Sequence, residues 1–248
     1  MAGLRMTYRN FKKKLKLDLS VNWFATWYFN LKMFPFSTAI KLPVFFYGKI
    51  RFSNLDGEMI IDAPITKGMI GFGQHFEFPS TSKGTAELFL QGKMICKGNV
   101  HIGKDVCIKI IKGAVLEMGH MACFGSDVRV VCTNKIKLGN WAGIGYQSQL
   151  VDTNSHPMFN TETRENYPLH GEIELGSYNA VSNKVSIMLH TKTPNNCVIA
   201  SNSLCNKDYS NLGENILLGG IPAKKIKDNF NRDWESEKEI LKQNKIIW

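Results

Sequence analysis

The chain has 248 residues, 44% of them hydrophobic, which is enough for a buried core. Its formal net charge of +10 suggests an anionic partner: nucleic acid, a membrane surface or a phosphate-bearing cofactor. The sequence has neither a zinc-finger spacing nor an RNP-like aromatic motif, so nothing else favours nucleic acid. The six cysteines form no C-x-x-C pair, and we expect reduced structural thiols, as in a cytoplasmic protein, rather than a zinc site.

Residues 1–40 are predicted to form a helical, aromatic extension. Within them, segment 19–36 contains two asparagines and a lysine, and it falls short of the roughly 18 uninterrupted apolar residues of a transmembrane helix. The basic stretch KKKLK before it resembles a signal-peptide start, but Asp18 and the lack of a small-residue cleavage site argue against one. We expect a helix packed on the domain. The alternative is an interfacial anchor that gives peripheral contact with the inner face of a membrane.

A six-residue repeat dominates the rest of the chain. Aliphatic residues stand at Leu138, Ile144 and Leu150, and the same spacing resumes at Leu175 and holds to Leu217. A period of six does not fit the 3.6 residues of a helical turn or the two-residue alternation of a strand. It fits a short strand followed by a tight corner, for which glycine and asparagine are suited. Three such units close a triangular coil, and stacked coils bury the aliphatic residues in one continuous core.

The hexad Leu/Ile/Val-Gly-x-x-Ala/Ser/Val resembles that of the hexapeptide-repeat acyltransferases over about residues 95–227. Within that family the chain is most similar to bacterial sugar and polysaccharide O-acetyltransferases, of the maltose and galactoside type and the capsule and O-antigen type. The resemblance implies an all-β fold, a left-handed parallel β-helix, whereas the period alone gives only a parallel solenoid. We expect the β-helix over 41–227, a loop insertion at about 157–172, and a C-terminal tail, 228–248, whose short helix covers the open end of the solenoid.

The repeat stops at His156, where the next inward aliphatic residue is due. The polar stretch that follows, with two prolines, is predicted to be a loop leaving the coil wall. The string TNSHPM matches the His-Pro that ends a repeat in sugar O-acetyltransferases of this family, where the histidine is the general base. The resemblance therefore implies that His156 takes the proton of a sugar hydroxyl as it attacks an acyl thioester. Asp152 either orients the imidazole or is a corner residue, and the candidate acceptor contacts are Asn154 and Ser126.

The resemblance also implies acetyl-CoA as the acyl donor, with no metal required. VIASNSLCNKD (198–208) and LGGIPAKKIK (218–227) resemble the family segments that contact coenzyme A, and LGSYNAVSN (175–183) ends where a small residue lines the thioester channel. Lysines in these segments suit the phosphates. The candidate cofactor-binding residues are Asn183, Ser201, Asn206, Lys207, Lys224 and Lys227.

The match has departures that concern the site. Ala180 stands where the family has a tryptophan, and Ala200 and Asn202 replace two glycines. Gly125, beside Ser126, stands where maltose and galactoside acetyltransferases have an asparagine. These changes affect the expected groove and acceptor contacts, so a simple disaccharide acceptor is not carried over.

The alternatives are a sugar-nucleotide N-acetyltransferase, which would use the same base and fold, and a non-catalytic β-helix scaffold. A γ-class carbonic anhydrase needs three histidine ligands, two of them five residues apart, and no pair of histidines here has that spacing. The expected acceptor is a saccharide of capsule, O-antigen or exopolysaccharide biosynthesis. The resemblance further implies a homotrimer with sites shared between neighbouring chains, and we expect a cytoplasmic location.

Overall fold

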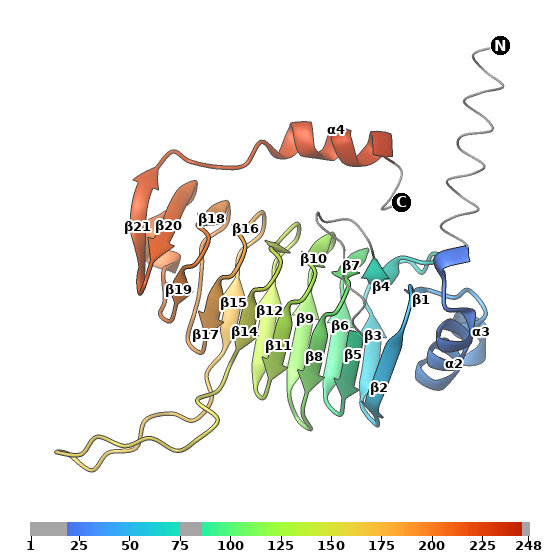
Figure 1. Cartoon of the computed structure of the whole chain (residues 1–248), viewed down its shortest axis with the longest axis horizontal. Helices are drawn as coiled ribbons and strands as arrows, with labels where there is room; N and C mark the ends of the chain where they lie inside the picture. The colour runs from blue at the N-terminus through green and yellow to red at the C-terminus, as the bar shows by residue number, and fades with distance from the viewer. Residues whose placement is uncertain (1–18, 75–85, 245–248) are drawn as a thin grey trace.

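Three parallel sheets wrap around one core in the computed structural model, which describes residues 19–74 and 86–244 (Figure 1). The basic stretch KKKLK and the last four residues of the tail lie outside this part. The nine-stranded sheet has the order β1 (Val44–Phe46), β4 (Ile70–Gln74), β7 (Val100–Gly103), β10 (Ala122–Phe124), β13 (Gly143–Ile144), β16 (Ala180–Val181), β18 (Cys197–Ile199), β20 (Ile216–Gly220) and β21 (Ala223–Asp228).

The other two sheets form the remaining faces of the prism. The seven-stranded sheet consists of β2 (Ile50–Leu55), β5 (Ala86–Leu90), β8 (Cys107–Ile110), β11 (Arg129–Cys132), β14 (Gln149–Val151), β17 (Ser186–Met188) and β19 (Leu204–Cys205). The five-stranded sheet consists of β3 (Glu58–Ile61), β6 (Lys93–Cys96), β9 (Val115–Met118), β12 (Lys135–Leu138) and β15 (Ile173–Leu175). Successive strands enter the three sheets in turn up to β17, as the predicted left-handed parallel β-helix requires, and beyond it the third face is continued by isolated bridges at Lys192.

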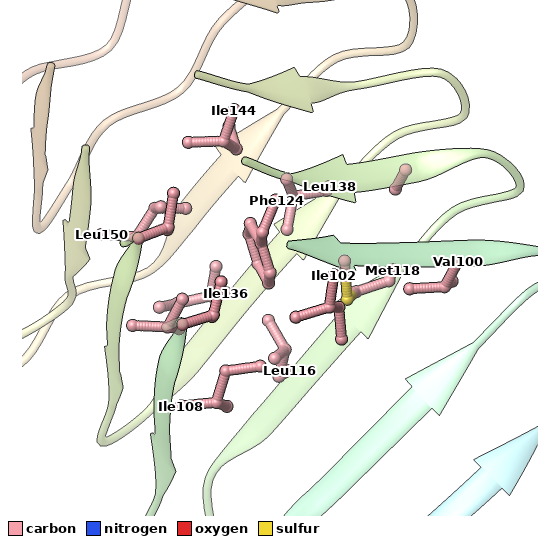
Figure 2. Close-up of a cluster of buried hydrophobic side chains, with 14 of the residues drawn as sticks. Val100, Ile102, Ile108, Leu116, Met118, Phe124, Ile136, Leu138, Ile144 and Leu150 are labelled. Atoms are coloured by element: carbon pink, nitrogen blue, oxygen red, sulfur yellow. The ribbon is translucent and has the colours of Figure 1, made fainter. Parts of the chain in front are cut away.

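The hexad positions from Leu138 to Leu150 and from Leu175 to Cys205 form the core, but the last two do not: Asn211 is exposed, and Leu217 lies between the buried Ile216 and Leu218. Leu138, Ile144 and Leu150 lie on β12, β13 and β14, one in each sheet, and each is at most 1% exposed. Figure 2 shows their side chains converging with Ile102 and Phe124 from the preceding coils. Burying each such aliphatic side chain contributes about 1.5–3 kcal/mol, so stacking many coils stabilises the solenoid along its length.

The corners use the expected glycine and asparagine only in part. Several corner residues with positive φ are other types, such as Asp127 (φ 57°), Gln147 (φ 57°) and Trp141 (φ 59°). The left-handed conformation costs about 1–2 kcal/mol in a non-glycine residue. Hydrogen bonds between stacked corners offset this cost, as where the Gln147 amide donates to the Ser126 carbonyl at 3.0 Å. Glycine stands instead where backbones crowd: a Cβ on Gly139 would lie 2.4 Å from the nitrogen of Ser177.

Three corners connect the sheets of the prism. The groove corner joins the nine-stranded to the seven-stranded sheet and carries Gln147, and the aromatic corner joins the five-stranded to the nine-stranded sheet and carries Trp141. The arm corner joins β14 to β15. There the chain leaves the wall as an antiparallel arm (residues 153–171), which projects from the solenoid in Figure 1. Thr153 pairs with His170 at the base of the arm, and Phe159 pairs with Asn166 farther out.

The N-terminal end of the solenoid is capped by α2 (Trp23–Met33), followed by the short α3 (Phe36–Ala39). The helix α2 supplies hydrogen-bond partners to the edge strand β1. The Asn30 amide donates to the Val44 carbonyl at 2.7 Å and accepts from the Val44 amide at 3.2 Å. The Thr26 hydroxyl accepts from the Phe46 amide at 3.2 Å. An edge strand that would otherwise offer unpaired backbone groups is thus closed by side chains.

The C-terminal end closes in a different way from the prediction. The edge of β20 is covered by β21, which pairs with it antiparallel. A 3₁₀ turn, η1 (Ser210–Leu212), precedes this hairpin, and α4 (Trp234–Asn244) follows it and runs back along the solenoid (Figure 1). The helix is therefore present, but it does not cover the open end. Its placement follows from Trp234, which packs edge-on against Trp141 and Tyr178 at the aromatic corner, with centroids 6.4 and 5.5 Å away.

Candidate functional site

His156 lies at the base of the arm with its side chain exposed to solvent. The turn before it is fixed by backbone and side-chain bonds: the His156 amide donates to the Asn154 carbonyl at 2.7 Å, and the Ser155 amide donates to the Thr153 hydroxyl at 3.0 Å. Inward-facing positions end earlier, at Asp152 and Thr153, which are the last buried residues of the coil. The imidazole therefore turns out of the wall, and its nitrogens make no hydrogen bond with residues 19–74 or 86–244.

Asp152 is fully buried and belongs to the corner of the coil below the arm. Its Oδ1 accepts from the amide and the hydroxyl of Thr133, both at 2.7 Å, and its Oδ2 accepts from the Asn134 amide at 2.8 Å. The Thr133 oxygen also lies 2.7 Å from Nδ1 of His170. Because the hydroxyl has one proton, which it gives to Asp152, the His170 nitrogen is the donor in that contact. Asp152 is thus linked through Thr133 to His170, and no interaction in the described structure joins it to His156.

A cleft at the base of the arm brings distant parts of the sequence together. The predicted residues Asn154 and Asn206 both line it, although Asn206 comes from the loop after β19. His156 stands between two lining residues, Asn154 and Met158, in the chain. The cleft is lined by Asn154, Met158, Tyr167, Pro168, Leu189, His190 and Asn206.

A second cleft, the face groove, lies on the nine-stranded sheet beneath the chain segment 230–232. Its floor is a column of small outward side chains in register across the sheet: Cys123 beside Gly143, and Ala180 beside Val198. Asn183, the predicted thioester-channel residue, lies at its margin. Because Ala180 carries a single methyl group, no bulky side chain rises from this part of the floor. Such a floor leaves room for a long, slender, neutral chain.

The remaining predicted residues are divided among three places. Lys207 is exposed at the arm corner, its amine 5.5 Å from the Tyr209 ring centroid. Ser126 and Ser201 lie at the groove corner, the same corner as Asn183, but neither lines the face groove. Lys224 and Lys227 are exposed on β21. The Lys227 amine lies 5.6 Å from the ring centroid of Phe230, which itself lines the face groove.

These positions separate the base from the groove within one chain. His156 belongs to the arm corner, whereas Asn183 belongs to the groove corner, and the seven-stranded sheet lies between them. A single chain therefore brings His156, Asn154 and Asn206 together at one edge of the prism. It places two candidate cofactor-binding residues, Asn183 and Lys227, away from that edge, whereas two others, Asn206 and Lys207, lie at the arm corner.

Sequence reasoning missed a buried histidine on β7. His101 is 3% exposed, its Nδ1 lies 2.9 Å from Oε1 of Gln74, and its Nε2 has no partner in the described structure. Burial, with a smaller contribution from the nearby His120, lowers the pKa of His101 to about 4. The ring is therefore neutral at pH 7, and it donates through Nδ1 to Gln74. The signal available in the sequence is the 27-residue spacing between Gln74 and His101, which places them on neighbouring strands of the nine-stranded sheet.

The described residues contain no group of three histidine, cysteine or acidic side chains that could hold a metal ion. The six cysteines are unpaired thiols. Burial raises the pKa of Cys96 and of Cys205 to about 12, so neither is a thiolate near neutral pH.

Comparison with family models and with curated proteins finds no match for this chain. Solved structures do match. The polySia-specific acetyltransferase NeuO shares 20% identity at a TM-score of 0.49, over 81% of this chain and 97% of that one. The polysialic acid O-acetyltransferase OatWY shares 16% at 0.48, over 74% and 90%. AntD, an N-acyltransferase from Bacillus cereus, shares 14% at 0.40, over 81% and 88%. The fold assignment itself rests on the three parallel sheets of this chain.

Proposed function

We propose that this protein is an acetyl-CoA-dependent O-acetyltransferase that modifies a saccharide hydroxyl in capsule, O-antigen or exopolysaccharide biosynthesis. The observation that carries the proposal is the exposed His156, which stands in the chain between two residues, Asn154 and Met158, that line a cleft with Asn206. The motif resemblance supplies the reaction class, and acyltransferases are among the solved structures similar to this chain. We further propose a cytoplasmic location, where acetyl-CoA is available.

The proposed reaction is a direct transfer. The neutral imidazole of His156 removes the proton of the acceptor hydroxyl as that oxygen attacks the thioester carbonyl. The tetrahedral intermediate then expels coenzyme A as its thiolate, which takes up the proton from the imidazolium and leaves as the thiol. A base of this kind contributes about 10²–10⁴ in rate. Backbone N–H groups near the arm are suited to stabilise the oxyanion.

The face groove fits the donor by its shape and by the charges around it. Its floor of small side chains suits the slender pantetheine arm, with Asn183 at the margin. Lys224 and Lys227 lie on the adjoining strand β21, where they suit the phosphates of coenzyme A. Lys225 is paired with Asp228 at 2.9 Å, so it offers less charge to a ligand than its neighbours. Ser201, Asn206 and Lys207 are proposed as further donor contacts, and Asn154 and Ser126 as acceptor contacts.

The separation of base and groove supports a homotrimer. If one chain places His156 and Asn183 on different corners, a complete site forms when the arm corner of one chain faces the groove of its neighbour. Closed symmetric rings are the common form of such head-to-tail contacts. Light scattering should then give a mass near three times the 28.0 kDa of one chain. A monomeric mass would remove the basis for a shared site.

The test of the activity is release of coenzyme A from acetyl-CoA in the presence of a panel of saccharides, nucleotide sugars and amino sugars. Product identity then separates the alternatives, because mild alkali hydrolyses an O-acetyl ester but leaves an N-acetyl amide intact. We expect an alkali-labile product. An alkali-stable product would favour the N-acetyltransferase, and a lack of release with every acceptor would favour the scaffold.

A further inference from the structure

The N-terminal cap exposes a large aromatic surface on its outer side. The exposed fractions are highest at Phe24 (84%) and Phe36 (73%), and Trp27, the most exposed tryptophan of the helix, is 42% exposed. Single exposed apolar side chains are ordinary, but a contiguous group on one helix face marks an interaction surface. We call this surface the aromatic patch; it consists of Trp23, Phe24, Trp27, Tyr28, Leu31, Phe36 and Ile40.

The patch is carried on a rigid support. The opposite side of α2 is buried through Ala25 and Phe29, and the Phe29 ring packs edge-on against Phe46 with centroids 5.0 Å apart. The hydrogen bonds of Asn30 to Val44 fix the same helix to the edge strand. The expected packing on the domain thus uses one side of α2. The other side is left as an apolar surface held in a fixed orientation at the end of the solenoid opposite β21 (Figure 1).

The sequence that carries this surface is strongly basic. Residues 1–55 contain ten of the 31 lysines and arginines of the chain but one of its 21 acidic residues. This segment therefore accounts for +9 of the net charge of +10. Lys32 and Lys41 are exposed on and next to the two helices, and the Lys67 amine lies 5.8 Å from the Trp23 ring centroid.

We infer that the aromatic patch docks this protein on the surface of an anionic lipid bilayer. Tryptophan and tyrosine favour the headgroup region, phenylalanine and leucine enter the acyl boundary, and lysines attract anionic lipids. A second copy of this chain is a poor occupant, because the exposed Lys32, Lys41 and Lys67 of each copy would be brought close to those of the other. No described helix is long and apolar enough to cross a membrane, so the contact is with the surface. The inference rests on this surface and is independent of the proposed activity.

The test is co-sedimentation of the full chain with vesicles of phosphatidylcholine, with and without 30% phosphatidylglycerol (about one lipid in three, a typical anionic mixture). We expect binding to the anionic vesicles that falls at least about tenfold in high salt. The double variant Phe24→Ser/Phe36→Ser should lower binding by at least about tenfold, since each substitution removes a highly exposed aromatic ring. The matched control is Phe159→Ser, which removes an exposed aromatic of the arm and should leave binding unchanged.

A second variant distinguishes a loss of membrane binding from a folding defect. Lys32→Glu with Lys41→Glu changes exposed charges and leaves the buried side of α2 intact, and it should weaken binding to anionic vesicles alone. Equal sedimentation of the wild-type protein and both variants would overturn the inference. So would equal binding to neutral and anionic vesicles. Self-association of the free protein that disappears in Phe24→Ser would instead assign the patch to a protein contact, and would also overturn it.

Discussion

The buried carboxylate of Asp152 holds Thr133 by both its backbone amide and its hydroxyl, each at 2.7 Å. With the Asn134 amide, these bonds satisfy both carboxylate oxygens at the corner where the arm leaves the wall. Hydrogen bonds to a charged group are worth about 1.5–3 kcal/mol, and a buried donor left unpaired costs about as much. Asp152→Ala should therefore lower the free energy of unfolding by several kcal/mol, as measured by urea denaturation.

A second variant, Asp152→Asn, separates the corner role of Asp152 from a catalytic one. If Asp152 acts at the corner, the Asp152→Asn protein that remains folded should keep kcat within about tenfold of the wild type, because the base is untouched. The effect of Asp152→Asn should instead be a lower free energy of unfolding. A stable Asp152→Asn protein that has lost about 10³ in kcat would restore Asp152 as the partner of the base.

His156→Ala should fold normally and lose about 10²–10⁴ in kcat for acetyl transfer. Folding is expected to be unaffected because the imidazole is exposed and makes no hydrogen bond with the described residues. The measurement is coenzyme A release, with the thermal midpoint recorded for each variant. His170→Ala is the matched control, since it removes another exposed histidine of the same arm. Equal loss in both variants would mean that the arm, rather than His156, was damaged.

A site shared between chains predicts complementation in mixed trimers. Gly143→Phe should block the face groove, because the new ring would fill the small-residue floor beneath segment 230–232. Alone, it and His156→Ala should both be inactive. When the two are co-expressed, about a quarter of the interfaces combine an intact arm with an intact groove, so about a quarter of the wild-type activity should return.

The control for this experiment is mixing the two purified proteins without subunit exchange, which should give no activity. Full inactivity of the co-expressed mixture, with mixed trimers shown by differential tags, would place base and groove in the same chain. The experiment therefore tests the arrangement of the site separately from the identity of the base.

The fold could be predicted because the inward residues leave a regular trace in the sequence. Leu138, Ile144 and Leu150 each meet a different sheet, and nothing but a three-sided coil turns a period of six into one core. The corners were less predictable, because stacked hydrogen bonds allow residues such as Gln147 and Trp141 to adopt positive φ. Propensity describes a residue in isolation and omits that support.

The surroundings of the site were harder to foresee. The period shows where the wall stops, but the antiparallel pairing of Thr153 with His170 depends on contacts within the arm. The position of α4 depends on Trp234 meeting two rings from different coils, Trp141 and Tyr178, which no local pattern reveals. The assignment of His156 as the base remains a prediction that the variants above test.

The stability of the protein should fall in mild acid because of His101. Burial lowers the pKa of this histidine from 6.5 to about 4 in the folded protein, so between these values the unfolded chain binds a proton that the folded chain does not. The part of the stability that depends on neutral His101 is therefore fully present above pH 6.5, and it declines as the pH falls towards 4. The decline amounts to about 3 kcal/mol, at 1.36 kcal/mol per pH unit.

The measurement is the free energy of unfolding in urea at pH 7 and at pH 4.5, for the wild type and for His101→Gln. Glutamine keeps a polar group near Gln74 but does not titrate, so the variant should lose this part of the pH dependence, whatever its stability at pH 7. Carboxylates also titrate in this range, but their contribution to the pH dependence is the same in both proteins and is removed by the comparison. An identical slope in both would show that His101 binds its proton equally well in the folded and unfolded chains, and would contradict its burial as a neutral ring.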